Sequence, residues 1–207
     1  MERPGRSRLV VAAVVTAASF ALLGMAVSAG VTAGFDSRVT EWVRVPALAW
    51  LQPVTEAGST PAIVAVAAVV LVVGWLTGGW RDAMAGALAI GIGALAVEII
   101  KRTRASVTPT ASPSGHTANA TVAYGVLAWL IGRATAWTLA GIVTFGVGLS
   151  RVWLGVHHPT DVLAGWLFGA TVLLLLAALN RPAPPGPGEG SAHADRAGPR
   201  SDPPVPG

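Results

Sequence analysis

Long stretches without a charged residue are the feature that most constrains this chain. Six runs of 16 to 27 residues carry at most one charge: Leu9–Phe35, Ala57–Trp80, Ala83–Ile100 (with Glu98), Thr117–Gly132, Ala134–Ser150 and Val162–Asn180. A helix of about 20 apolar residues crosses the ~30 Å hydrocarbon layer of a bilayer. The runs therefore predict an all-α fold, a six-span transmembrane helical bundle, with five spans if one short run is not a crossing.

The composition agrees with a membrane protein and excludes several classes of site. Charged residues make up 12% of the chain and the mean hydropathy is +0.61, whereas a soluble domain has about 25% charged residues. The chain has no cysteine, which excludes a disulfide framework, a thiolate metal site and a cysteine nucleophile. The net charge is +4, but the 14 basic residues are scattered among apolar runs and form no basic face. No nucleic-acid partner is therefore predicted.

The chain divides into three parts. Residues 1–56 are predicted to hold the first span and an extracytoplasmic interfacial loop, which starts at residue 36, has tryptophans suited to the headgroup layer and could contain one short amphipathic helix. The first run is longer than a signal-peptide core, so it is interpreted as a retained span. Residues 57–180 form the core of five spans. Residues 181–207 hold 8 Pro and 5 Gly and are predicted to be a disordered cytoplasmic tail.

An even number of spans places both chain ends on one side of the membrane. Eight arginines then share that face: Arg3, Arg6, Arg8, Arg81, Arg133, Arg181, Arg196 and Arg200. The positive-inside rule makes this face cytoplasmic. His116, His157 and His158 lie beside predicted span ends on the opposite, extracytoplasmic face, where an ionisable residue at the membrane is a functional hypothesis by default.

The first of three polar clusters is Pro113-Ser114-Gly115-His116, directly before an apolar run. Proline and glycine favour a tight turn, and the amides that follow open a helix. Several N–H groups and the positive end of the helix dipole would then point at one anion. The alternative is a Ser/Gly helix cap with an uninvolved histidine.

The second cluster is Ser150-Arg151 followed by His157-His158-Pro159-Thr160-Asp161. Proline suits the first turn of a helix, so Asp161 would lie in that turn and reach back to His157. A carboxylate on one imidazole nitrogen leaves the other free as a nucleophile. Arg151 offers a forked set of donors for phosphate oxygens. The alternative is a loop salt bridge between Arg151 and Asp161.

The third cluster, Glu98, Lys101, Arg102 and Arg104, ends the third run. An ordinary basic flank that anchors a helix in the headgroups would explain it, but such cations prefer the cytoplasmic face. Glu98 and Lys101 are three residues apart and can pair on a helix surface.

Together the clusters resemble the type 2 phosphatidic acid phosphatase superfamily, membrane lipid phosphatases related to vanadium haloperoxidases. The family pattern is K-x6-R-P, then P-S-G-H, then S-R-x5-H-x3-D, and the second and third motifs match in full over roughly residues 57–180. The resemblance implies that His157 is the nucleophile, Asp161 orients it and His116 is the general acid. It further implies that Lys101, Ser114, Gly115 and Arg151 hold the phosphate.

The first motif departs from the family pattern. Counting from Lys101 places Thr108, not arginine, before Pro109. In a register that keeps Arg104 as the motif arginine, Val97 stands at the lysine position and Ala105 at the proline position. The Lys101 register is therefore preferred. Arg104 or Arg102 would then replace the missing guanidinium in holding the phosphate. Loss of one preorganised donor costs about 2.7–4 kcal/mol of transition-state stabilisation.

These residues, with the resemblance, predict an integral cell-membrane phosphatase for a lipid phosphate that acts through a phosphohistidine without metal or cofactor. The resemblance implies a substrate of the phosphatidic acid or undecaprenyl diphosphate type. The main alternative is a weak or inactive relative that binds lipid phosphates, because Thr108 replaces the motif arginine. A transporter is less favoured, since no inverted halves are visible. A zinc hydrolase is disfavoured by the absence of an H-E-x-x-H pair. The sequence does not indicate the lipid or the oligomeric state.

Overall fold

The computed structural model describes residues 5–43, 51–77, 79–105 and 113–180, without the side chains of residues 104 and 105. These residues form eight helices and no strand. In chain order the helices are α1 (Arg6–Ser28), α2 (Ala33–Val43), α3 (Leu51–Glu56), α4 (Thr60–Thr77), α5 (Trp80–Ala105), α6 (Gly115–Ile131), α7 (Ala134–Trp153) and α8 (Pro159–Leu179).

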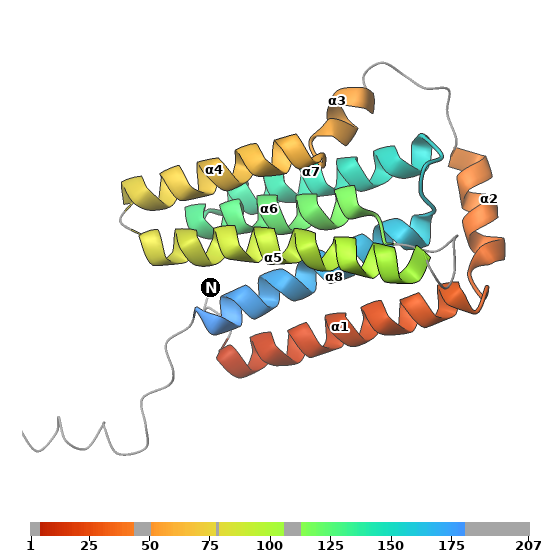
Figure 1. Cartoon of the computed structure of the whole chain (residues 1–207), viewed down its shortest axis with the longest axis horizontal. Coiled ribbons are helices and arrows are strands. Elements are labelled where there is room, and N and C mark those ends of the chain that lie inside the picture. The colour runs from red at the N-terminus through yellow and green to blue at the C-terminus, as the bar shows by residue number, and fades with distance from the viewer. Residues whose placement is uncertain (1–4, 44–50, 78, 106–112, 181–207) are drawn as a thin grey trace, which may run out of the picture.

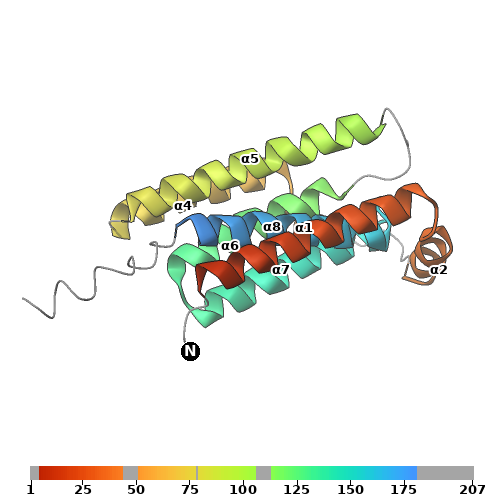
Figure 2. The same cartoon turned by 90° about the horizontal axis from the view of Figure 1, so that it is seen from below.

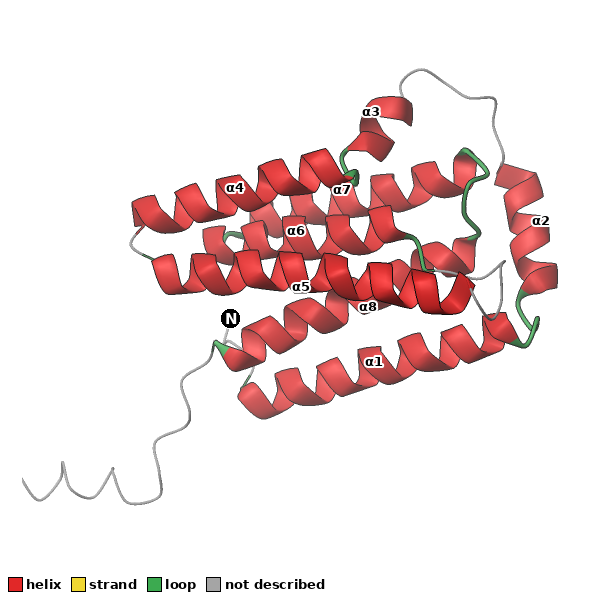
Figure 3. Ribbon diagram, in the orientation of Figure 1, coloured by secondary structure: helices red, strands yellow, loops and turns green. Residues whose placement is uncertain are grey.

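Six long helices lie side by side and alternate in direction, while two short helices cover one end of the bundle (Figures 1 and 3). The short helices are α2 and α3, at the end where α1, α5 and α7 finish and α4, α6 and α8 begin. The start of α1 and the end of α8 lie together at the opposite end. In the view from below, α1 and α8 run next to each other along the bundle (Figure 2).

Five of the described helices are long and apolar enough to cross a membrane: α1, α4, α5, α7 and α8. The remaining long helix, α6, has 17 residues and packs against α4, α5, α7 and α8. Eight of its residues are buried, so α6 is the central helix of the bundle. The all-α fold is thereby confirmed, with five candidate spans.

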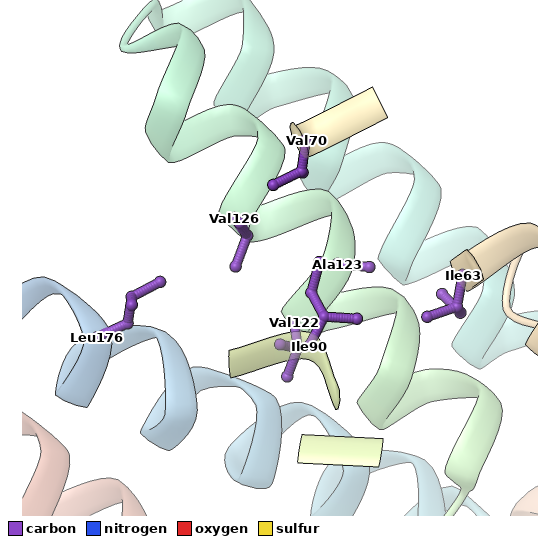
Figure 4. Close-up of a cluster of buried hydrophobic side chains, with 7 residues drawn as sticks. All are labelled: Ile63, Val70, Ile90, Val122, Ala123, Val126 and Leu176. Atoms are coloured by element: carbon purple, nitrogen blue, oxygen red, sulfur yellow. The ribbon is translucent and has the colours of Figure 1, made fainter. Parts of the chain in front are cut away.

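The core confirms this central position of α6 (Figure 4). Buried side chains from four helices meet there: Ile63, Val70, Ile90, Val122, Ala123, Val126 and Leu176. Many large apolar side chains face outward instead, on α1, α4, α5 and α7. An outward apolar surface of this kind is stable where lipid, not water, is the solvent.

The helix ends differ from the boundaries of the uncharged runs. The first run was predicted as one span to Phe35, but α1 ends at Ser28. Gly30 adopts φ 74°, its N–H bonds to the carbonyl of Val27, and the N–H of Val31 bonds to the carbonyl of Ala26. This is the Schellman arrangement that closes a helix. The chain then turns into α2, so the interfacial region holds two short helices, not one.

Candidate active site

The three polar clusters lie at the end of the bundle that α2 and α3 cover. The Ser114 turn opens α6, the Arg151 segment closes α7, the Asp161 turn opens α8 and Lys101 lies in the last two turns of α5. The alternation of helix direction brings these four helix ends to one side. Residues from four separate helices therefore meet in one region.

The turn between α7 and α8 sets the spacing of Arg151 and His157. The carbonyl of Arg151 accepts hydrogen bonds from the N–H groups of both Val156 and His157, each at 3.2 Å. Gly155, with φ 66°, makes the reversal in a conformation that disfavours a side chain. Five intervening residues thus fold back so that His157 lies next to the end of α7.

The first turn of α8 holds the His157–Asp161 pair. Pro159 is the first helical residue, where its missing N–H costs no hydrogen bond. One oxygen of Asp161, Oδ2, lies 3.3 Å from Nδ1 of His157 and accepts the N–H of His158 at 3.1 Å. The predicted reach of Asp161 back to His157 is confirmed. With Nδ1 held by the carboxylate, Nε2 is the nitrogen left with a free lone pair.

A backbone hydrogen bond joins the Ser114 turn to this pair. The N–H of Ser114 donates to the carbonyl of Asp161 at 3.0 Å. Ser114 caps α6, because its Oγ accepts the N–H of Thr117 at 3.4 Å and the hydroxyl of Thr117 at 3.0 Å. Ser114 and Thr117 are fully buried, so this junction between α6 and α8 is rigid.

The guanidinium of Arg151 is partly engaged and partly without a partner. Its Nη1 donates to Oγ1 of Thr55, in α3, at 3.0 Å. Its Nε is buried and has no hydrogen-bond partner among the described residues. The alternative of a salt bridge to Asp161 is not what the structure shows, since that carboxylate contacts His157. A buried N–H without an acceptor is costly, and an anion bound at Arg151 would satisfy it.

His116, outside the five apolar spans, lies in an electropositive environment. Partial burial lowers the pKa of its imidazole below the ordinary 6.5, and the positive charge of Arg151 adds to the shift. The carboxylate of Glu56 opposes it, while His157 and Lys101 contribute in the same direction as Arg151. Three groups that can carry a positive charge and one carboxylate therefore act on the pKa of His116.

The third cluster is described in part. A Cβ added to Gly115 would lie 3.8 Å from Nζ of Lys101, which places that ammonium beside the Ser114-Gly115-His116 turn. Nζ also lies 3.9 Å from Oε2 of Glu98. Arg102 is exposed and its Nε donates to Glu98 at 2.9 Å, so its guanidinium is paired within the third cluster. The side chain of Arg104 and residues 106–112, with Thr108 and Pro109, lie outside the described residues.

Two buried residues of the short helices were missed by sequence reasoning. Thr55 is the partner of Arg151, and Asp36, in α2, accepts two hydrogen bonds from Thr160 in α8. Both lie about a hundred positions or more before their partners, and no spacing rule links them to the site. His158 is exposed, and its Nδ1 lies 3.3 Å from Oγ1 of Thr40.

The described part of the chain contains no group of three or more His, Asp or Glu side chains able to hold a metal ion. The zinc hydrolase alternative would need His116, His157, His158 and Asp161 around one ion. Nδ1 of His158 instead faces Thr40 in α2. Among the described residues that ligand set is therefore not assembled.

A model of one protein family, the PAP2 superfamily, matches residues 59–183. The chain belongs to this superfamily. The resemblance that the motifs indicated is thereby confirmed, and the matched range covers every motif residue. The short helices α2 and α3 precede it.

Individual members of the PAP2 superfamily match shorter stretches. Phosphatidylglycerophosphatase B of Bacillus subtilis (strain 168) is 37% identical over 73 residues, which are 31% of this chain and 36% of that protein. A decaprenylphosphoryl-5-phosphoribose phosphatase of Mycobacterium tuberculosis (strain H37Rv) is 45% identical over 60 residues, 29% of this chain and 32% of its own. The matches thus span about a third of these curated relatives.

The fold is shared more widely than the sequence. The crystal structure of a transmembrane PAP2-type phosphatidylglycerolphosphate phosphatase from Bacillus subtilis superposes with a TM-score of 0.67 and 24% identity. The superposition covers 81% of this chain and 94% of that one. The bundle is therefore the fold of a known transmembrane PAP2 protein.

Proposed function

We propose that this protein is an integral-membrane phosphatase that hydrolyses a phosphomonoester or diphosphate of a lipid through a phosphohistidine intermediate. The observation that carries the proposal is the pairing of His157 with Asp161 beside Arg151, whose buried Nε lacks a partner among the described residues. Membership of the PAP2 superfamily and the phosphatase names of its relatives support the same reaction class.

In the proposed first step, Nε2 of His157 attacks phosphorus in line with the leaving oxygen. The bond from the attacked phosphorus to the leaving oxygen breaks, and protonated His116 gives its proton to that oxygen. The leaving oxygen is the lipid alkoxide oxygen of a monoester or the bridging oxygen of a diphosphate. Asp161 holds Nδ1–H of His157 and stabilises the positive charge that develops on the ring. Arg151, Lys101 and the N–H groups of Gly115 and His116, at the start of α6, would stabilise the charge on the phosphoryl oxygens, since phosphoryl transfer depends mainly on positioning and charge.

In the second step, water attacks the phosphohistidine. Neutral His116 takes a proton from this water, the bond from phosphorus to Nε2 breaks, and inorganic phosphate leaves. His157 returns to its neutral form and His116 to its protonated form. The protons and the electron pairs balance with one water consumed, so the scheme calls for no metal or cofactor.

The substrate is inferred from where the site would lie in the membrane. We place α6 as the sixth crossing over residues 117–132, which makes the site end extracytoplasmic and the Arg6, Arg8, Arg81 and Arg133 end cytoplasmic. A site at the outer headgroup level favours amphiphiles whose phosphate lies at that depth. Phosphatidic acid and a polyprenyl diphosphate of the undecaprenyl type are the leading candidates, and a phosphatidylglycerol phosphate is a third.

The replacement of the first-motif arginine by Thr108 favours a second candidate, a weak or inactive relative that binds lipid phosphates. We propose instead that Arg104 supplies the missing guanidinium, since Arg102 is paired with Glu98. An Arg104→Ala variant should then lose more turnover than Arg102→Ala. Equal and negligible losses would remove this role for Arg104.

The test of the proposed function is a panel of lipid phosphates offered to the purified protein in detergent with EDTA present. We expect release of inorganic phosphate from at least one lipid, and its abolition in His157→Ala. His193→Ala is the control, because this histidine lies outside the matched range of residues 59–183; it should keep most of the activity. Binding of lipid phosphate without turnover would favour the inactive relative, and a strict need for divalent metal would contradict the scheme.

A further inference from the structure

A buried carboxylate outside the motifs contacts the turn that carries the reacting pair. Asp36, in α2, is 5% exposed. Its Oδ1 accepts the N–H of Thr160 at 3.2 Å, and its Oδ2 accepts the hydroxyl of Thr160 at 2.6 Å. Thr160 is the second residue of α8 and is also buried. A charged group in such a place is stable only when it is fully hydrogen-bonded.

Both carboxylate oxygens of Asp36 accept hydrogen bonds from Thr160, at the start of α8. The first N–H groups of a helix lack partners within the helix and carry its positive dipole end. Asp36 accepts one of these N–H groups, that of Thr160, and also accepts a hydrogen bond from the hydroxyl of Thr160. It thus acts as a helix cap supplied by another helix, 124 positions away in the chain.

The capped turn is the one that aligns the site. Asp161, the next residue after Thr160, contacts Nδ1 of His157 through its side chain and Ser114 through its carbonyl. A second contact from α2, between Thr40 and His158, lies on the other side of Pro159. Helix α2 therefore holds the turn on both sides of the proline, and a shift of the turn would move the nucleophile and the Ser114 junction together.

We propose that Asp36 is a positioning residue of the phosphatase site, which fixes the first turn of α8 so that Asp161 and His157 keep their alignment. The inference rests on the proposed function. It assigns a role to a residue that precedes the region shared with the PAP2 superfamily model, residues 59–183. It also gives α2 a function beyond covering the end of the bundle.

The role predicts a specific kinetic signature. Asp36→Ala frees the turn but leaves Arg151 and Lys101 in place, so kcat should fall by about 10- to 100-fold, as for a small misplacement of reacting groups, with KM nearly unchanged. Asp36→Asn keeps an acceptor for the N–H of Thr160 and should recover most of the loss. Glu41→Ala, which removes an exposed carboxylate from the same helix, is the matched control and should behave like wild type.

A double-mutant cycle with Thr160→Val tests whether the effect passes through this contact. Thr160→Val removes the hydroxyl donor, and the pair Asp36→Ala/Thr160→Val should lose no more kcat than Asp36→Ala alone. Three results would overturn the inference. The kcat losses of Asp36→Ala and Thr160→Val could multiply in the double variant, or KM could rise by the same factor by which kcat falls. The third is a kcat for Asp36→Ala equal to that of Glu41→Ala. If Asp36→Ala does not fold, Thr160→Val alone should lower kcat with KM nearly unchanged, and a wild-type kcat for Thr160→Val would then overturn the inference.

The two proposals fail in different ways. Wild-type protein that releases no phosphate from any lipid contradicts the proposed function. Turnover by the wild-type protein, together with kcat losses of Asp36→Ala and Thr160→Val that multiply, contradicts only the role of Asp36.

Discussion

At the residue scale, Asp161 contacts both halves of the proposed site through its carboxylate and its backbone carbonyl. Its carboxylate holds His157 and the N–H of His158, while its carbonyl accepts the N–H of Ser114. One residue therefore links the proposed nucleophile to the turn that carries the proposed acid. A substitution there would disturb both halves.

The pH dependence follows from the environment of His116. Burial, followed by the charge of Arg151, lowers the pKa of its imidazole below 6.5. A general acid must be protonated, so kcat/KM should fall as pH rises through this lowered pKa. We expect the alkaline limb of kcat/KM for the free enzyme to lie below pH 6.5.

An NMR titration of the His116 ring provides the direct measurement. Its pKa in the free protein should be below that of an ordinary histidine, and inorganic phosphate should raise it, because a bound anion favours the imidazolium. A pKa at or above the ordinary value, or no response to phosphate, would contradict the assignment of His116 to the anion site.

Thr55 offers a second residue-scale prediction. Thr55→Val removes the acceptor of Arg151 Nη1 and leaves a partly buried N–H without that acceptor, which costs up to about 3 kcal/mol. Because Arg151 would lose its orientation toward the phosphate, KM should rise by roughly 5- to 30-fold, which is about 1–2 kcal/mol in binding. Thr138→Val, an exposed threonine of α7, should leave KM unchanged. Equal KM values for the two variants would remove the role of Thr55.

Local spacing explains which residues of the site could be predicted. The His157–Asp161 contact follows from a helix that starts at Pro159, and the Ser114 cap from a Ser-Gly turn before an apolar run. The contacts of Thr55 and Asp36 span 96 and 124 positions and depend on how helices pack. One sequence without that packing gives no signal for them.

At the element scale, the close approach of α6 and α8 determines the geometry of the site. A Cβ at Gly165 would lie 2.9 Å from the carbonyl oxygen of Ser114 and 3.0 Å from Cβ of Thr117. Glycine at this position lets the first turn of α6 lie against α8. The uncharged runs predicted both helices but not this contact, because hydropathy records burial and not which faces meet.

Gly165→Ala should therefore destabilise the bundle beside the site. Overpacking against backbone costs about 1–3 kcal/mol, and we expect a loss of that size in the free energy of unfolding, together with reduced turnover. Unfolding in detergent followed by circular dichroism measures it. Gly141→Ala, in α7 with nothing within 4 Å of the added Cβ, is the control and should be neutral or slightly stabilising. Equal effects of the two variants would contradict the packing argument.

Helix ends show where sequence patterns stop being informative. The third uncharged run ends at Ile100, yet α5 continues to Ala105, and along its surface Glu98 pairs with Lys101 and Arg102. Conversely, α1 ends at Ser28 inside an uncharged run, where Gly30 closes the helix. Hydropathy therefore marks neither helix end.

At the scale of the whole molecule, the alternating helices separate two ends of different character. The α2 and α3 end carries the proposed site, and the other end carries Arg6, Arg8, Arg81 and Arg133 near the starts of α1, α5 and α7. We propose from the positive-inside rule that this end faces the cytoplasm. The uncharged runs predicted the bundle. They did not predict that α2 covers one end of it, because α2 contains only the last residues of an uncharged run followed by a mixed polar sequence.

Orientation can be tested cleanly because the chain has no cysteine. Ser37→Cys lies on an exposed position of α2 and Ala134→Cys on an exposed position at the start of α7. In intact cells a membrane-impermeant maleimide should label Cys at the first position, and should label Cys at the second after permeabilisation alone. The reverse pattern would place the site in the cytoplasm.

The central claim, nucleophilic attack by His157, is tested most directly by trapping its intermediate. A lipid carrying a radiolabelled phosphate is mixed with excess protein, quenched in alkaline detergent, where phosphohistidine survives, and the labelled peptide is mapped. The account predicts transient label on His157, and neither label nor turnover in His157→Ala. Label on another residue, or turnover that persists in His157→Ala, would contradict it.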